Sequence, residues 1–492
     1  MNASRTPLLL VGTLVLTGVS QPGLLAGDYN LNSAARVSPG YINDLLRADN
    51  PYASQWNVGV NYRVRYEIHE NGNLPPLSAR DFSAAPGVDN DNSYLLQRVK
   101  ARVGYTAEWF EVFGEARSSS STGDDRNPNP ESDGPVDLHQ AYVYLGNHKE
   151  FPLSLKVGRQ ELSYGDERVI GAFAWNNIGR VFDAAKLRWQ NAWFGADFFT
   201  SRLVLPDDNQ FNVSNDYDYF SGVYATTKKV PKVTMDAYFL ARNASASAAT
   251  SQPTSLFPMP SARDIYTLGV RLKSTPEDWG NWDFTGEYMG QFGHYNDPRL
   301  IAASLNPSLS HEAFALYSGV GYTWKESSVT PRVGLEYNFA SGDSNPRDDR
   351  HETFENLFPT NHKFYGFMDF ASLQNLHNVR LQTSIKPVAR INLAAEGHLF
   401  WLADTSDNFY TVGGAPRGGI GATPGNGYGI NTGYSSFVGS EIDLVATYTV
   451  NSYIQVEAMY GHFFRGNFVK NTFAAVGSQD ADFVYLQTVF HF

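Results

Sequence analysis

Residues 56–69 separate their side chains completely by parity. The even positions carry Trp, Val, Tyr and Ile, whereas the odd positions carry Asn, Gly, Arg, Glu and His. Successive side chains of a β-strand point to opposite faces, so this segment predicts a strand with one apolar and one charged face. A membrane-spanning strand needs about 9 to 11 residues, whereas strands of soluble proteins average about five or six. The length of this segment therefore favours a strand that crosses a bilayer.

The same pattern recurs along the whole chain. We expect strands at eighteen segments: 56–69, 96–106, 110–118, 137–145, 153–160, 182–190, 192–200, 217–227, 232–241, 264–273, 281–291, 312–323, 330–340, 377–386, 390–402, 437–449, 452–464 and 483–492. Short connections alternate with long segments rich in Gly, Pro, Asn and Asp, as periplasmic turns alternate with extracellular loops. The pattern predicts an all-β fold: a monomeric, transmembrane, antiparallel β-barrel of about 18 strands.

Composition excludes several other classes of protein. After the N-terminal segment there is no run of about 18 apolar residues, so transmembrane helices are not expected. The chain has no cysteine, which rules out disulfides and thiolate metal sites. A net charge of -12 argues against nucleic acid as a partner.

Both ends of the sequence favour export to the bacterial outer membrane. Residues 1–27 combine Arg5, a short apolar run and small residues, and they predict a signal peptide. We expect residues 28–55 to form an N-terminal periplasmic segment and residues 56–492 to form the barrel. The final strand places Phe490 and Phe492 on its lipid face. The expected partners are therefore outer-membrane lipids and the barrel-assembly machinery.

Three stretches carry a specific resemblance. They are KVGRQELSYGDERVIGAFAWNNIGRVFDAAKLRW (156–189), YNFASGDSNPRDDRHETFENLFPTNHKFYGFMDF (337–370) and VGSEIDLVATYTV followed by GHFFRGNF (438–468). The chain resembles the alginate-export family of outer-membrane porins in these stretches and over most of its mature length. The resemblance implies an eighteen-stranded barrel that passes an anionic polysaccharide.

A pore for a polyuronate needs cations along its wall, because each sugar carries a carboxylate that an Arg fork can bind. We expect pore-lining or substrate-binding roles at Arg63, Arg65, Arg98, Lys100, Arg102, Glu115, Arg117, Arg159, Lys186, Arg188, Arg271, Arg332 and Arg380. The alternative is a salt-bridge scaffold, in which these cations only satisfy acidic neighbours such as Glu67, Asp283, Glu287, Glu336, Glu396, Glu441, Asp443 and Glu457. The two roles can coexist.

Arg159 breaks the apolar phase set by Leu155 and Val157. A bulge at Gly158 would turn its side chain into the lumen, and the alternative is a role in anchoring the loop that follows. That loop is expected either to fold inward as a constriction or to pack on the surface.

Asp343, Asn345 and Asp348 have a spacing reminiscent of a calcium loop, so a structural Ca²⁺ is one possibility, although most such turns bind nothing. No other cofactor is expected. No nucleophile, base and acid occur at a recognisable spacing, which disfavours an outer-membrane barrel enzyme. The leading hypothesis is a passive channel for an alginate-like anionic polysaccharide or its oligosaccharides. The alternative is a general or substrate-specific uptake porin for small anionic solutes.

Overall fold

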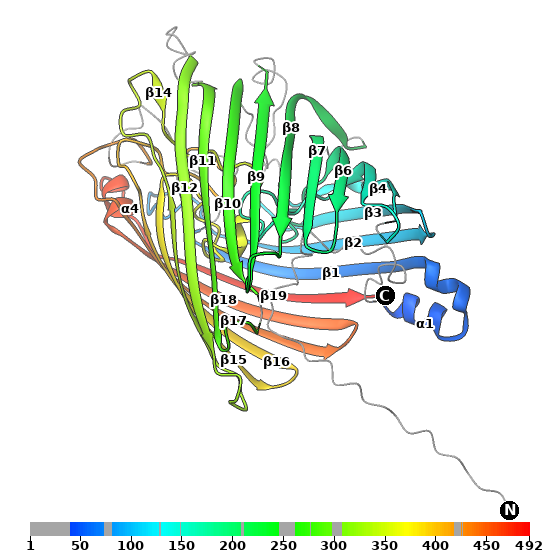
Figure 1. The fold of residues 1–492 in the computed structure, drawn as a ribbon. Helices are drawn as coiled ribbons and strands as arrows, with labels where there is room; N and C mark the ends of the chain where they lie inside the picture. Colours follow the sequence, from blue (N-terminus) through cyan, green and yellow to red (C-terminus); the bar gives the residue numbers. More distant parts are fainter. Residues whose placement is uncertain are drawn as a thin grey trace, which may run out of the picture.

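A computed structural model describes residues 40–72, 81–126, 129–147, 149–207, 211–245, 261–275, 277–297, 308–417, 425 and 427–492. The predicted signal peptide, residues 1–27, and the adjoining residues 28–39 lie outside the described residues. Eighteen long antiparallel strands of this one chain form the wall of a closed barrel. Figure 1 shows these strands surrounding a lumen, with the C-terminus near the start of β1. The predicted fold class is confirmed.

The wall strands follow one another in chain order. They are β1 (Trp56–Glu70), β2 (Asn92–Thr106), β3 (Phe110–Thr122), β4 (Asp133–Leu145), β5 (Leu153–Gln160), β6 (Phe182–Gln190), β7 (Phe194–Leu205), β8 (Val213–Thr227), β9 (Val233–Ala244), β10 (Arg263–Ser274), β11 (Trp282–Asn296), β12 (Ser308–Thr323), β13 (Arg332–Ala340), β15 (Leu376–Val388), β16 (Ile391–Trp401), β17 (Phe437–Asn451), β18 (Ile454–Arg465) and β19 (Ala481–His491). All eighteen expected segments coincide with these strands. Several strands extend further toward the long loops than expected.

The remaining elements are short. They are α1 (Tyr41–Asp49), the 3₁₀ turns η1 (Pro51–Gln55) and η2 (Asn361–Lys363), β14 (Arg350–His351) and α4 (Asn467–Thr472). β14 adds a parallel two-residue pairing to β12 and belongs to a long loop rather than to the wall. Among the described helices, none has the length and apolar character needed to cross a membrane.

The barrel closes between β1 and β19. Their register runs from Asn61 opposite His491 to Glu70 opposite Asp482. The final residue extends the ladder, because Val60 N donates to Phe492 O over 3.0 Å and Phe492 N donates to Val60 O over 2.7 Å. Closure satisfies the backbone groups of both end strands, which hydrocarbon could not hydrogen-bond.

Helix α1 packs against the start of β1 near this seam (Figure 1). Asn43 is buried, and its side chain donates to Asn57 Oδ1 over 2.9 Å and accepts from Val58 N over 2.7 Å. On the neighbouring turn, Tyr453 OH donates to Asp44 over 2.7 Å. The predicted periplasmic segment therefore contacts both sides of the closing seam.

Tryptophans mark the end of the barrel that carries the short turns. Six exposed tryptophans lie in or beside these turns: Trp56, Trp109, Trp193, Trp279, Trp282 and Trp324. Such rings are enriched at the interface between lipid and water, where an apolar body meets a polar N–H group. The ring of tryptophans therefore places one membrane boundary at the short-turn end.

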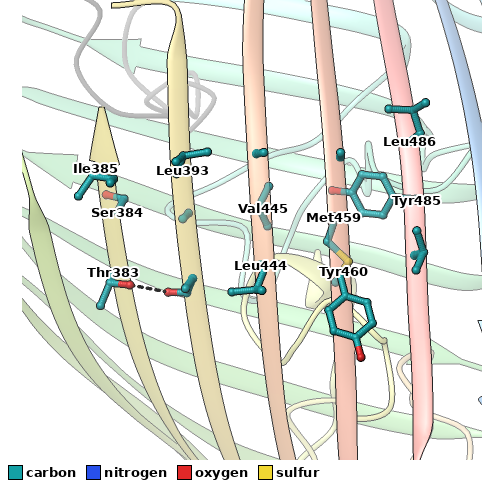
Figure 2. Close-up of a pocket in the computed structure, with 15 residues that line it drawn as sticks. Thr383, Ser384, Ile385, Leu393, Leu444, Val445, Met459, Tyr460, Tyr485 and Leu486 are labelled. Atoms are coloured by element: carbon teal, nitrogen blue, oxygen red, sulfur yellow. Dashed lines mark hydrogen bonds between the residues drawn. The ribbon is translucent and has the colours of Figure 1, made fainter. Parts of the chain in front are cut away.

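A recess of about 650 Å³ hollows the outer wall across β15 to β19. Figure 2 shows Leu393, Leu444, Tyr460 and Leu486 around it. Ala446 lies opposite Ala458 in the register, and these small side chains leave room between their larger neighbours. The exposed lining residues share the lipid-facing phase of their strands, so this recess faces acyl chains and not the pathway through the barrel.

We predict that the folded barrel is heat-modifiable on a detergent gel. Opening the sheet in detergent or lipid would leave unpaired N–H and C=O groups along two strand edges, which makes the closed form resistant. Unboiled and boiled samples should migrate differently. Identical migration of membrane-inserted protein would contradict a closed barrel.

Candidate functional site

The loop between β5 and β6, residues 161–181, folds into the barrel and crosses its lumen. We call this loop the strap. At one end of the crossing, Asn177 Nδ2 donates to the carbonyls of Gln97 in β2, at 3.0 Å, and Ser120 in β3, at 3.2 Å. At the other end, Arg168 pairs with Glu336 of β13 at 2.7 Å, and Asp166 pairs with Lys273 of β10 at 2.6 Å. The strap therefore joins two walls that lie far apart in the strand order.

The long loop between β13 and β15, residues 341–375, runs beside the strap. Gly171 N donates to Phe358 O over 2.8 Å, and Phe358 N donates to Val169 O over 2.9 Å, which makes a short parallel bridge. Arg180 donates to Pro359 O over 2.9 Å. Through these contacts the two loops together form a constriction inside the barrel. This matches the first of the two alternatives for the strap, an inward fold rather than packing on the surface.

Arg63 and Arg98 hold the middle of the strap. The two residues lie directly opposite each other on β1 and β2. Each donates to Ala174 O over 3.0 Å, and Arg63 and Arg98 reach Asn176 O at 3.2 Å and 3.3 Å. Neither guanidinium lies within 4.0 Å of a carboxylate among the described residues. Two buried like charges thus converge on neutral carbonyl oxygens.

Arg65 reaches the strap differently. Its guanidinium lies 3.5 Å from the centre of the Trp175 ring and donates to Trp175 O over 3.0 Å. The opposite face of Trp175 stacks on His362 of the β13–β15 loop, with ring centres 3.8 Å apart. Arg65 also pairs with Glu67 on its own strand at 2.5 Å. A cation–π contact and a ring stack therefore join wall, strap and second loop in one column.

The next predicted residues form a compact charge network on β2 to β4. Lys100 lies 2.7 Å from His139, 3.4 Å from Glu161 and 3.7 Å from Glu115. Arg117 pairs with Asp133 and donates to Ile178 O of the strap over 2.8 Å. Arg102 lies nearer the short-turn end and donates to Asn57 over 3.3 Å. Lys100 and Arg117 therefore have acidic partners, as the scaffold alternative expects.

The cations on later strands also have carboxylate partners. Lys186 and Arg188 share Asp197 at 3.6 Å and 3.1 Å, and Arg271 lies 3.2 Å from Asp236. Arg332 pairs with Asp283 at 2.6 Å, and Arg380 pairs with Glu396 at 2.7 Å. Each of these residues thus has a carboxylate within 4.0 Å, whereas Arg63 and Arg98 have none among the described residues. Their pore-lining role stays a prediction.

Arg159 remains in the outward phase of β5 and does not turn into the lumen. Gly158 has a φ of 126°, yet the pairing of β5 with β4 keeps its register through Arg159. The Arg159 guanidinium pairs with Asp183 at 2.9 Å, directly across on β6, and donates to Asn212 O over 3.0 Å. This geometry matches the anchoring alternative, since Asp183 closely follows the strap.

Several strap partners were not among the residues singled out from the sequence. His139 is fully buried and lies between Lys100 and Arg117, and Glu131 accepts from Asn177 N over 2.6 Å. Asp166 accepts from Tyr317 OH over 3.2 Å. His139 shares the parity of the outward-facing Val143 and Leu145, and it turns inward because the register of β4 shifts between Gln140 and Leu138, which parity alone does not reveal. Glu131 and Asp166 lie in loops, where no periodicity indicates direction.

The three residues of the predicted calcium loop take part in hydrogen bonds that stabilise local turns. Asp343 Oδ1 accepts from Asn345 N over 3.1 Å, and Asp348 Oδ1 accepts from Arg350 N over 2.9 Å. The other Asp343 oxygen is buried and accepts no hydrogen bond from the described residues, while Asp343 N donates to Asp407 over 3.1 Å. Burial, and next the negative charge of Asp407, raise the pKa of Asp343 to about 7. Bound Ca²⁺ at this loop stays a prediction.

The family model for alginate export matches residues 54–480, which is most of the chain. The chain belongs to the alginate-export family. The match confirms the resemblance seen in the three sequence stretches. No curated protein matches this alginate-export family member.

Solved structures of outer-membrane porins share the fold. Pseudomonas aeruginosa OpdO is 11% identical with a TM-score of 0.54, and the match covers 89% of this chain and 97% of that one. Acinetobacter baumannii OccAB1 is 10% identical, with coverages of 89% and 96% and a TM-score of 0.53. Pseudomonas aeruginosa OccK2 in complex with glucuronate is 10% identical, with coverages of 89% and 96% and a TM-score of 0.52.

These findings agree on location and class. The family and the shared porin fold identify a bacterial outer-membrane protein and support a channel. They point to a channel rather than to an enzyme.

We predict that the loop cluster around Asp343 loosens as the pH rises. The pKa of this carboxyl is raised on folding, from an ordinary value of 3.8 to about 7. The folded cluster therefore binds a proton that the opened loop releases, and its stability falls as the pH increases from about 4 through about 7. Hydrogen exchange at Asn345 and Asn408, corrected for intrinsic rates, should show more opening at pH 8 than at pH 6.

The matched variant is Asp343→Asn, which cannot ionise. Its exchange should lose most of this pH dependence. An unchanged pH dependence in the variant would contradict the assignment to Asp343. Protection restored by Ca²⁺ at pH 8 in the unmodified protein would favour the calcium loop, because the ion would hold both carboxylates ionised.

Proposed function

We propose that this protein is a passive outer-membrane channel for an anionic, alginate-like polysaccharide or its oligosaccharides. The Arg63 and Arg98 pair at mid-height of the lumen carries the proposal. Both side chains are buried, face each other across two strands and donate to the same backbone carbonyls of the strap. A site built only for stability would be expected to place a carboxylate between two such charges.

Carbonyl oxygens are replaceable partners for these guanidiniums. A hydrogen bond between Arg and a carboxylate joins two opposite charges and can be bidentate, whereas a bond from Arg to a carbonyl involves only the charge of the guanidinium. A uronate carboxylate that reaches Arg63 and Arg98 can therefore displace the carbonyls of Ala174 and Asn176. In the proposed mechanism the polymer exchanges partners with the strap and moves past it, one carboxylate after another.

Negative charges on the far wall would oppose the passage of anions unless nearby cations offset them. Glu336 is matched by Arg168, and Glu396 by Arg380, whereas Glu441 and Asp443 have no Lys or Arg partner among the described residues. The basic pair has no carboxylate within 4.0 Å among the described residues, although the charge of Glu131 beside the strap attracts both guanidiniums. In the proposed channel, the charges of Arg63 and Arg98 raise the potential beside the strap, which favours anions.

A small-anion uptake porin is the second candidate. The observation that favours it is the glucuronate complex of the OccK2 structure, since glucuronate is a single uronate unit. Both candidates need the same cationic constriction. They differ in the length of the anion that passes.

We predict anion selectivity that depends on the charge of Arg63 and Arg98. In planar bilayers with a KCl gradient, the reversal potential should report a preference for Cl⁻. The preference should weaken at high salt, because the field is screened over roughly 10 Å at 0.1 M. In the Arg63→Gln, Arg98→Gln double variant it should drop or reverse.

The matched control is the Arg63→Lys, Arg98→Lys double variant. Lys keeps both charges but cannot reproduce the planar fork that holds the strap. It should therefore retain anion selectivity, while its current becomes noisier. Cation selectivity of the unmodified channel, or equal selectivity in the Gln and unmodified forms, would assign these arginines to the scaffold alone.

A further inference from the structure

Four ionisable side chains form a buried square on the lumen side of β16 and β17. Glu396 lies opposite Asp443, and His398 lies opposite Glu441. Parity points all four inward, and His398, Glu441 and Asp443 are almost completely buried. None of these four side chains forms a hydrogen bond or ion pair with the strap among the described residues.

The square carries more negative charge than its surroundings compensate. Arg380 pairs with Glu396 through two hydrogen bonds of 2.7 Å and 2.8 Å. Both carboxylate oxygens of Asp443, and Oε2 of Glu441, lack a well-aligned N–H or O–H donor among the described residues, although Phe367 N and the Glu441 carboxyl lie close to Asp443. The other oxygen of Glu441 accepts from Met368 N over 2.9 Å. Three carboxylates against one guanidinium leave about two buried negative charges, which cost several kcal/mol unless a cation or protons offset them.

The donor atoms converge as metal ligands do. His398 Nε2 lies 3.4 Å from Glu396 Oε2 and 3.8 Å from Asp443 Oδ2, and all three donor atoms fall within 4.8 Å of one another. Ligands at about 2.0 to 2.1 Å from a tetrahedral zinc ion lie roughly 3.4 Å apart. The two separations from His398 match such a site to within a few tenths of an ångström, and the Glu396 and Asp443 oxygens would close from at most 4.8 Å.

We propose that Glu396, His398 and Asp443 bind a divalent transition-metal ion, with Zn²⁺ as the best fit. An imidazole nitrogen in the donor set disfavours Mg²⁺ and Ca²⁺, which prefer oxygen ligands, and suits zinc. Glu441 lies opposite His398 in the register and offers a further carboxylate near these three residues. The double positive charge of the ion would offset the two excess negative charges of the square.

The surroundings of His398 restrict its ring. The imidazole lies nearly parallel to the Phe400 ring, with 3° between the planes, and Asn378 Nδ2 lies 3.4 Å from Nδ1. A metal on Nε2 leaves the proton on Nδ1, which Asn378 can accept only if its amide turns and gives up its hydrogen bonds with Asn338 and Leu399. Outer contacts of this kind orient a ligand, and their loss typically weakens metal binding by about 10- to 100-fold.

The site would serve the proposed function without depending on it. Segment 366–368 of the β13–β15 loop packs over the square through Met368 N and Glu441. A bound ion would fix this part of the loop to β16 and β17. It would also remove negative charge from a wall that faces the lumen, where an anionic polymer is proposed to pass.

Metal content of the purified, untagged barrel tests the proposal. The protein in detergent is freed of metal with a chelator, incubated with Zn²⁺ and separated from unbound ion by gel filtration. We expect one zinc ion per chain by mass spectrometry of the metal, and a higher melting temperature than that of the metal-free barrel. Asp443→Asn and His398→Gln should each lose the bound zinc.

Glu457→Gln is the matched control. Glu457 is a carboxylate on the adjacent strand β18, but it is already held by Tyr485 OH at 2.8 Å and Thr447 Oγ1 at 3.1 Å. This variant should keep its zinc. Heat-modifiability confirms folding of each variant before its metal content is compared.

Two results would overturn the proposal. If the unmodified barrel retains no zinc and its melting temperature is unchanged, the square is neutralised by protons rather than by a metal. If both Asp443→Asn and His398→Gln retain as much zinc as Glu457→Gln, the ion binds elsewhere. Neither result bears on anion selectivity, so failure of this proposal is distinguishable from failure of the proposed function.

Discussion

Hydrogen bonds from wall arginines to strap carbonyls organise the lumen. A backbone segment inside a barrel must satisfy its own polar groups, because it has no sheet partner there. Backbone carbonyls in the middle of the strap accept hydrogen bonds from four wall arginines. These are Arg63, Arg65, Arg98 and Arg117. Hydrogen bonds that involve a charged group contribute about 1.5 to 3 kcal/mol each. The position of the strap, and through it that of the β13–β15 loop, depends on this set.

The same bonds explain how stability and selectivity coexist in one wall. Most cations of the lumen are paired with carboxylates, as Arg271 is with Asp236, and these pairs hold strands and loops in place. The Arg63 and Arg98 pair is fixed by neutral oxygens instead. Its geometry is defined while its charge remains available to an anion. In the proposed function this difference separates structural cations from those that meet the polysaccharide.

The strands could be predicted from the sequence because parity and length act locally. The fourteen residues after Gln55 already separate the lipid face from the lumen face, and the structure places Arg63 and Arg65 inward as that parity requires. Long membrane strands leave little freedom in assignment, since a shift of one residue would expose every charge to lipid. Arg159 shows the limit: of the two roles left open by the sequence, its pairing with Asp183 directly across on β6 supports the anchoring of the loop.

The constriction could be predicted only in part. Backbone carbonyls of residues 174–176 carry no sequence signal, so the partners of Arg63 and Arg98 could not be inferred from the chain. The same holds for the square on β16 and β17. Each member has inward parity, but only the register places His398 beside Asp443. Contacts between residues distant in the chain required the closed barrel to be known.

Block of single-channel current by oligosaccharides tests the central claim most directly. A uronate oligomer should interrupt the current of the unmodified channel in a voltage-dependent way, whereas the oligomer of equal length with its carboxylates reduced to alcohols should not. The account predicts that the interruptions shorten or vanish in the Arg63→Gln, Arg98→Gln variant and persist in the corresponding Lys variant. Equal block by the charged and the neutral oligomer, or unchanged block in the Gln variant, would contradict it.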